Sequence, residues 1–105
     1  MQALCITKPG GPDVLAICAV PTPEPKRDEL LVRVRVAGLN RADTLQRRGH
    51  YPPPPGYPED IPGLEYAGDV VAAGTDVRRF RAGQRVFGLT GGGAQAEYLT
   101  IPETL

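Results

Sequence analysis

The sequence predicts a mainly β fold, a small and partly open β-barrel with one or two short helices, formed by a single domain over residues 1–105. Short segments rich in Val, Leu and Ile alternate between apolar and polar residues, as half-buried strands do. The 13 glycines and 12 prolines place turn signals between these segments. A chain of 105 residues has the length of one ordinary domain, so the strands are expected to share a modest core.

The N-terminal part predicts a hairpin. Residues 1–7 and 14–20 have strand character, and the Pro/Gly/Asp cluster at 9–13 between them is a strong turn signal. Three prolines at alternate positions then predict an extended surface connector over residues 21–27.

The clearest strand is LVRVRV at residues 31–36. Its three valines share one face, which we expect to be buried, and Arg33 and Arg35 share the face exposed to water. Later strands are expected where similar apolar alternation recurs between turn signals, over residues 66–73, 85–88 and 94–101.

Charge and cysteine usage restrict the class of protein. Twelve basic and twelve acidic side chains cancel, so no net field favours nucleic acid or an acidic membrane as a partner. The arginine cluster between residues 78 and 85 is expected to be a solvated turn. No apolar run has the length of a signal peptide or of the ~20 residues that span a bilayer. Cys5 and Cys18 lie in apolar segments, and we expect both to be reduced in a soluble cytoplasmic protein.

The most unusual chemistry lies between residues 37 and 68, in a segment predicted to form a loop-rich cleft. Residues 41–48 contain neither Pro nor Gly and predict one or two helical turns that Asn40 can cap. The helix is expected to end at Gly49. The four prolines at 52–55 have fixed φ and no amide hydrogen, so they should run on as a stiff extended segment.

Tyr51, between this helix and the prolines, is the best candidate for a functional side chain. Its phenol could stack on a planar ligand while the hydroxyl donates to a carbonyl oxygen, or it could simply pack on the proline rings. Asn40 could offer its amide to a ligand, although helix capping is favoured. Arg41 could bind a phosphate or be a surface charge. Asp43 and Glu65, the acids nearest the cleft, are expected to pair with arginines as structure.

Other chemistries find little support. Gly91-x-Gly93-x-x-Ala96 superficially matches a dinucleotide-binding fingerprint, but a strand-like sequence follows it where a helix is required. Serine is absent from the chain, which excludes a serine triad. His50 is the single histidine and both cysteines lie on strands distant from it, so neither a metal site nor a thiol nucleophile is expected.

Five segments, in the order in which they follow along the chain, resemble the N-terminal GroES-like catalytic domain of the medium-chain dehydrogenases/reductases. They cover nearly all of the chain: KPGGPDVL, AGLNRADTLQRRGHY, PGLEYAGDVVAAGTDV, AGQRVFGL and GGGAQAEYLTIPE. The resemblance is to the zinc-free NADPH:quinone oxidoreductase branch, and within it to tyrosine-containing quinone reductases of the p53-inducible type.

Departures from the zinc alcohol dehydrogenases assign this branch. By motif position, Asn40 stands where those enzymes have a catalytic cysteine, and Leu64 stands where they have a histidine. An amide and an alkyl chain therefore replace two ligands of a catalytic zinc. Ala42 replaces the hydroxyl of their proton relay, and the four-cysteine lobe of their structural zinc is missing.

The resemblance implies hydride transfer from NADPH to a quinone or a similar conjugated carbonyl, without a metal, in a cleft between this domain and a Rossmann domain. It implies that Tyr51 and Asn40 are catalytic and that Tyr51 and Leu64 contact the substrate. Asn40 would also lie near the nicotinamide, and Arg41 near the pyrophosphate of the cofactor. The full-length protein is expected to be a homodimer.

The chain stops before the Rossmann domain of such enzymes would begin. We therefore expect a truncated domain that, alone, has no reductase turnover and no micromolar affinity for NADPH. The alternative function is a non-catalytic GroES-like binding or oligomerisation module. A co-chaperonin of that kind would need a long mobile apolar loop, whereas the corresponding loop here is polar and rich in proline. A regulatory relative that binds a ligand without chemistry is a third alternative.

Overall fold

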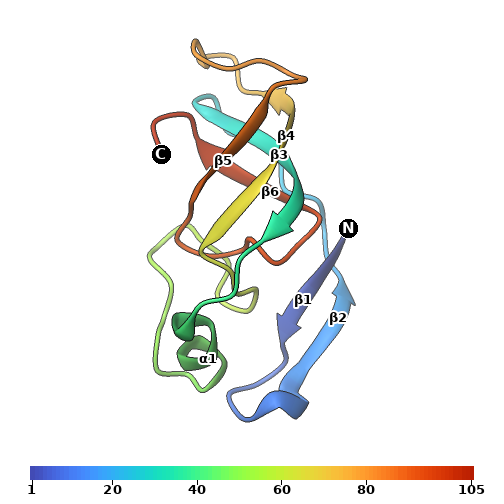
Figure 1. Cartoon of the computed structure of the whole chain (residues 1–105), viewed down its shortest axis with the longest axis vertical. Coiled ribbons are helices and arrows are strands. Elements are labelled where there is room, and N and C mark those ends of the chain that lie inside the picture. Colours follow the sequence, from blue (N-terminus) through green and yellow to red (C-terminus); the bar gives the residue numbers. More distant parts are fainter.

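The computed structural model describes residues 1–105 and contains two antiparallel sheets and one α-helix (Figure 1). The hairpin sheet pairs β1 with β2, and the larger sheet has the strand order β5-β4-β3-β6. In chain order the elements are β1 (Gln2–Ile6), the 3-10 turn η1 (Pro12–Val14), β2 (Leu15–Ala19), β3 (Glu29–Ala37), α1 (Arg41–Arg47), β4 (Glu65–Ala73), β5 (Arg85–Leu89) and β6 (Tyr98–Pro102). The prediction of a mainly β fold with a partly open barrel is confirmed.

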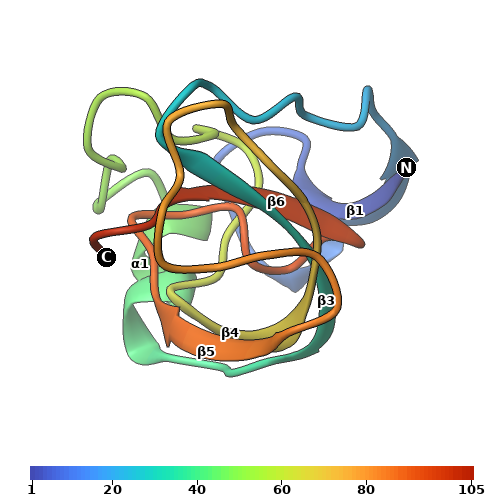
Figure 2. The same ribbon diagram turned by 90° about the horizontal axis from the view of Figure 1, so that it is seen from above.

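The larger sheet curls around the main hydrophobic core. Viewed from above, β4 and β5 lie on one side and β6 crosses on the other (Figure 2). Side chains from β3, β4 and β6 meet between them, together with Ala94 from the loop before β6. The buried members of this cluster are Leu30, Val32, Tyr66, Val70, Ala94, Leu99 and Ile101.

The face of β3 only partly follows the simple alternation expected from its sequence. Val32 is fully buried and Val34 is half-buried, but Val36 is 64% exposed. The register between β3 and β4 shifts between Val34 and Val36, and such an irregularity re-aims the residues that follow it. The expectation that all three valines are buried is therefore wrong for Val36.

The predicted N-terminal hairpin is confirmed, but the predicted state of its cysteines is wrong. Cys5 and Cys18 form a disulfide, with their Cα atoms 6.2 Å apart. In the register of the hairpin, Ala3 pairs with Cys18 and Cys5 pairs with Ala16. Cross-strand partners and residues two apart share a face, so the two cysteines are diagonal neighbours on one face. That separation lies within the range a disulfide spans.

A second small core joins the hairpin to the rest of the molecule. Ala3, Cys5 and Ile61 are buried together, with Cys18 and Ala96 packed around them. Ile61 belongs to this hairpin cluster, and Tyr66 belongs to the main core. The segment between Ile61 and Tyr66 therefore bridges the two packing units.

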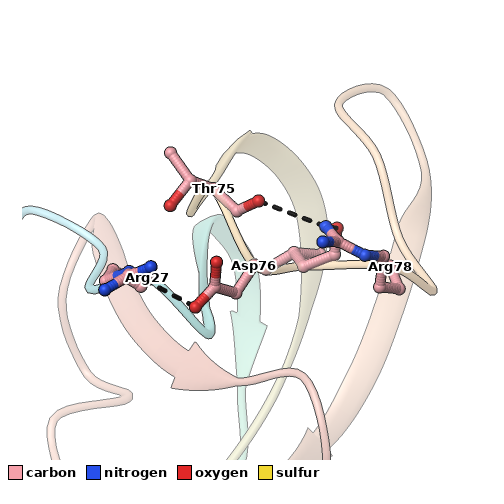
Figure 3. Close-up of polar contacts among 5 residues, drawn as sticks. Arg27, Thr75, Asp76 and Arg78 are labelled. Atoms are coloured by element: carbon pink, nitrogen blue, oxygen red, sulfur yellow. Dashed lines mark hydrogen bonds and ion pairs between the residues drawn. The ribbon is translucent and has the colours of Figure 1, made fainter.

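Arg78, Arg79 and Arg81 lie in a solvent-exposed loop, as predicted, whereas Arg85, which is also exposed, begins β5. Arg27 pairs with Asp76 at 3.3 Å, and Arg78 donates from Nη1 to the carbonyl of Thr75 at 3.2 Å (Figure 3). Exposed pairs of this kind contribute little to stability. The backbone N–H of Arg79, aided by that of Arg78, lowers the pKa of the Glu103 carboxyl.

No helix of this chain combines the length and the apolar character that crossing a membrane demands.

Candidate functional site

The site region begins at α1, where the predicted cap is confirmed. Asn40 is the N-cap, with an extended backbone at φ −133° and ψ 156°. Asp43 lies in the first turn and closes a reciprocal pair with it. The backbone N–H of Asn40 donates to the Asp43 side chain, at Oδ2, over 2.9 Å. The backbone N–H of Asp43 donates to the backbone carbonyl of Asn40 over 3.0 Å. The backbone at the N-terminus of α1 is therefore fixed.

Asp43 also holds two other segments. Its Oδ1 accepts a hydrogen bond from the amide of Gly63 at 3.1 Å, and its Oδ2 accepts one from Nε2 of Gln95 at 3.2 Å. The expectation that Asp43 pairs with an arginine is wrong, because three uncharged donors surround its carboxylate. One side chain thus joins the helix, the segment before β4 and the loop before β6.

Glu65 also lacks the expected arginine partner. It is exposed at the start of β4, and the arginines that form ion pairs in this chain take other acids. Arg35 donates from Nε to Asp69 at 2.8 Å, and Arg27 pairs with Asp76. The charges near the candidate site are therefore less neutralised than the sequence led us to expect.

Because Gly63 has no side chain, the backbone before β4 can pack closely against the loop before β6. Its φ is +116°, and an added Cβ would lie only 2.6 Å from the amide nitrogen of Gln95. The carbonyls of Pro62 and Gly63 accept hydrogen bonds from Gln95 and Ala94, at 3.0 and 3.2 Å. Thr90 then donates to the carbonyl of Leu64 at 2.8 Å. Leu64 is thereby held half-buried between two bonded segments.

Tyr51 follows the opposite end of α1. The helix ends at Arg47, shortly before the expected end at Gly49, and Gly49 has φ +82°, as a glycine that ends a helix often does. The amide of His50 still donates back to the carbonyl of Leu45 at 2.8 Å. Tyr51 is half-buried, and its hydroxyl forms no hydrogen bond within the chain.

The predicted site residues thus divide into two groups. Asn40 and the segment carrying Leu64 are brought together through Asp43. Arg41 lies beside Asn40, exposed and without an ion pair. Tyr51 lies beyond the C-terminal end of α1, whereas Asn40 and Arg41 lie at its N-terminal end. A hollow of about 660 Å³ between the proline connector, residues 55–58 and β6 is lined by none of the four predicted residues.

Sequence reasoning missed the linking role of Asp43 and Gln95. The spacing of Asn40 and Asp43 is that of a capping box, with an acid at the third helical position, and this signal could have identified the first contact. The contacts to Gly63 and Gln95 span 20 and 52 residues of sequence, so no local pattern encodes them.

Burial raises the pKa of the Tyr66 phenol, and the neighbouring Tyr57 adds to the shift.

The chain contains no group of three or more His, Cys, Asp or Glu side chains arranged to hold a metal ion. The glycines at 91 and 93 precede a loop and then β6, rather than the helix that a dinucleotide fingerprint needs.

Comparison with known proteins agrees with the fold. Residues 26–105 match the alcohol dehydrogenase GroES-like domain. A chloroplastic quinone-oxidoreductase homologue from Spinacia oleracea is 42% identical over 101 residues, which cover 91% of this chain and 30% of that protein. A quinone oxidoreductase from Pseudomonas syringae pv. tomato superposes with a TM-score of 0.88 and 36% identity, over 97% of this chain and 31% of its own.

An Escherichia coli quinone oxidoreductase solved in complex with NADPH superposes with a TM-score of 0.82 and 32% identity, over 97% of this chain and 31% of its own. The chain thus spans about 30% of the length of the curated relatives that it matches. The family model covers residues 26–105, which is most of the chain. The chain therefore belongs to the alcohol dehydrogenase GroES-like domain family.

Proposed function

We propose that this domain is the substrate-side part of an NADPH-dependent quinone oxidoreductase. The observation that carries the proposal is the similarity, near 40% identity over at least nine-tenths of the chain, to three relatives. They are named a quinone-oxidoreductase homologue in a plant, a probable quinone oxidoreductase in a yeast and a quinone oxidoreductase in a bacterium. Hydride would pass from the nicotinamide of NADPH to a quinone or a similar conjugated carbonyl in a cleft that this domain shares with a cofactor-binding domain.

The residues at the candidate site fit chemistry that uses no metal. Asn40 and Leu64 are poor zinc ligands, since zinc in proteins is bound by thiolates, imidazoles and carboxylates. A quinone accepts hydride readily, so positioning and a few hydrogen bonds can supply the remaining catalysis. We propose that the catalytic wall is zinc-free and that Asn40 and Tyr51 provide the polar contacts.

Each side chain has a role that its exposure allows. Tyr51 has a free hydroxyl and a half-exposed ring, so it can donate to a quinone oxygen and stack on its plane. Leu64 would form the apolar side of the substrate pocket. Arg41 has no partner in the chain, so its guanidinium is free to face the pyrophosphate of the cofactor.

The proposal extends to the whole protein. A longer chain with a Rossmann domain would form a homodimer in the cytoplasm. NADPH, which supplies the hydride, would be bound mainly by the Rossmann domain.

The test is steady-state kinetics on the full-length protein that contains this domain. We expect NADPH oxidation that depends on a quinone such as 1,4-benzoquinone and is unchanged by a metal chelator. Tyr51→Phe removes one hydrogen bond to the acceptor and should lower kcat/KM by about ten-fold. Tyr98→Phe, which alters a half-buried tyrosine on β6, is the matched control and should stay within about two-fold.

Two results would contradict the proposal. One is the absence of NADPH oxidation with any quinone tested, which would remove the activity itself. The other is loss of activity on chelation with recovery on adding zinc, which would restore a metal to the mechanism. If Tyr51→Phe and Tyr98→Phe changed kcat/KM equally, the proposed quinone reduction would stand, but Tyr51 would have only a packing role.

A further inference from the structure

The disulfide lies where the hairpin is attached to the candidate site. β1 donates from the amide of Ile6 to the carbonyl of Asp60 at 2.7 Å, and from the amide of Leu4 to the carbonyl of Gln95 at 2.9 Å. The amide of Glu97 donates back to the carbonyl of Gln2 at 3.1 Å. These bonds join the hairpin to the two segments that Asp43 also holds.

The other end of the hairpin reaches α1. The amide of Gly10, in the turn that leads to β2, donates to the carbonyl of Arg47 at 2.9 Å, and Nε of Arg47 donates to the carbonyl of Gly10 at 3.0 Å. Arg47 is the last residue of α1, and Tyr51 follows four residues later. The hairpin therefore contacts, directly or through one element, every segment that carries a predicted site residue.

The main core does not depend on the cysteines. Neither sulfur belongs to the seven-residue cluster between β3, β4 and β6. Cys5 is instead buried, at 4% exposure, in the small cluster with Ala3 and Ile61. Breaking the disulfide should therefore loosen the hairpin and its attachments without dissolving the larger sheet.

The two cysteines differ in exposure. Cys18 is half-buried, whereas Cys5 is covered by the hairpin cluster. Thiol–disulfide exchange requires a thiolate to attack one sulfur and displace the other. The structure favours attack at Cys18, with the thiolate of Cys5 as the leaving group.

We propose that Cys5 and Cys18 form a reversible redox site that controls how firmly the hairpin holds the candidate site. An external dithiol would attack Cys18, form a mixed disulfide and then close its own disulfide. Two electrons and two protons thereby pass to the protein, which is left with two thiols. Oxidation by glutathione disulfide would run the same exchange in the opposite direction and yield two molecules of glutathione. This inference does not depend on quinone reduction.

The test measures thiols and amide exchange on the same 105-residue chain. After incubation with glutathione disulfide, alkylation and mass spectrometry should find no free thiol. After dithiothreitol they should find two. Reduction should speed hydrogen exchange at least about ten-fold at the amides that attach the hairpin, those of Leu4, Ile6, Gly10 and Glu97. The amides of Val70 and Gly74, bonded within and beside the larger sheet, should change less than about two-fold.

Variants separate the redox effect from side-chain packing. Cys18→Ala removes the crosslink but keeps the buried Cys5 in its cluster. It should show the exchange rates of the reduced protein with or without dithiothreitol.

Two outcomes would overturn the proposal. The first is two free thiols that persist in glutathione disulfide. The second is a disulfide whose reduction leaves exchange at the four attaching amides unchanged.

Discussion

Asp43 shows how much one short side chain can organise. Its two oxygens accept hydrogen bonds from Asn40, Gly63 and Gln95, which lie in three separate segments. Hydrogen bonds to a charged acceptor are stronger than neutral ones, and removing the acceptor leaves partly buried donors without partners.

We therefore expect Asp43→Ala to lower the free energy of unfolding by about 2–4 kcal/mol. Asp69→Ala, which removes only the partly exposed pair with Arg35, should cost less than about 1 kcal/mol and serves as the control. Urea titration followed by circular dichroism measures both values. Equal losses in the two variants would mean that the bonds to Asp43 contribute nothing beyond an ordinary surface charge.

At the scale of elements, the segment before β4 is defined by a backbone conformation that few residues tolerate. Gly63 combines a positive φ with a close approach to Gln95. Gly83 has a positive φ of +95° as well, but an added Cβ there would meet no atom within 4 Å. Alanine substitutions at the two glycines therefore distinguish the cost of the strained φ alone, at Gly83, from that cost plus a steric clash, at Gly63.

Gly63→Ala should lower the free energy of unfolding by about 3 kcal/mol or more, since the strained φ and the clash add. Gly83→Ala should cost about 1 kcal/mol, from the strained φ alone. Guanidinium unfolding midpoints give the comparison. If the two substitutions cost the same, the tight packing of Gly63 on Gln95 is not present in solution.

Most elements could be predicted from local sequence, and the failures have a common cause. The hairpin, β3, β4, β5 and the cap of α1 follow from alternation, turn residues and capping chemistry. The last strand begins at Tyr98 instead of the expected Ala94, because Ala94 and Gln95 bond to the segment around Gly63. The disulfide was not predicted although the hairpin was. Turn signals predict that two strands pair, but they do not fix the register that makes Cys5 and Cys18 diagonal neighbours.

The candidate site could be predicted only in part. Asn40, Arg41 and Leu64 lie on or beside the junction that Asp43 holds, within the segment from residue 37 to 68 that was predicted to form the cleft. The junction itself depends on contacts between residues 20 and 52 positions apart, which alternation and capping rules do not encode. The roles of these residues and of Tyr51 toward substrate and cofactor stay predictions.

At the scale of the whole molecule, the chain is an elongated body of 41 × 22 × 19 Å that offers one wall of the proposed cleft. Tight dinucleotide binding normally uses a glycine-rich turn between a strand and a helix. The glycines at 91–93 lead instead into a loop and β6. Arg41 and Asn40 alone provide too few contacts to replace such a turn.

The 105-residue chain alone should therefore neither reduce quinones nor saturate with NADPH at micromolar concentrations. Titration monitored by nicotinamide fluorescence tests the binding, and absorbance at 340 nm tests the turnover. Arg41→Ala provides the matched variant. A saturable signal with a micromolar Kd that Arg41→Ala abolishes would show that this wall binds the cofactor unaided.

The stretch from Ile61 to Tyr66 spans the two packing units, one end anchored in each, and Leu64 lies between the anchors. Small rocking of the hairpin unit against the barrel would therefore tilt the backbone that carries Leu64, while both interiors stay closely packed. In the proposed quinone oxidoreductase, a pocket wall that spans the two packing units would adjust to acceptors of different width by rigid-body movement, without local unfolding.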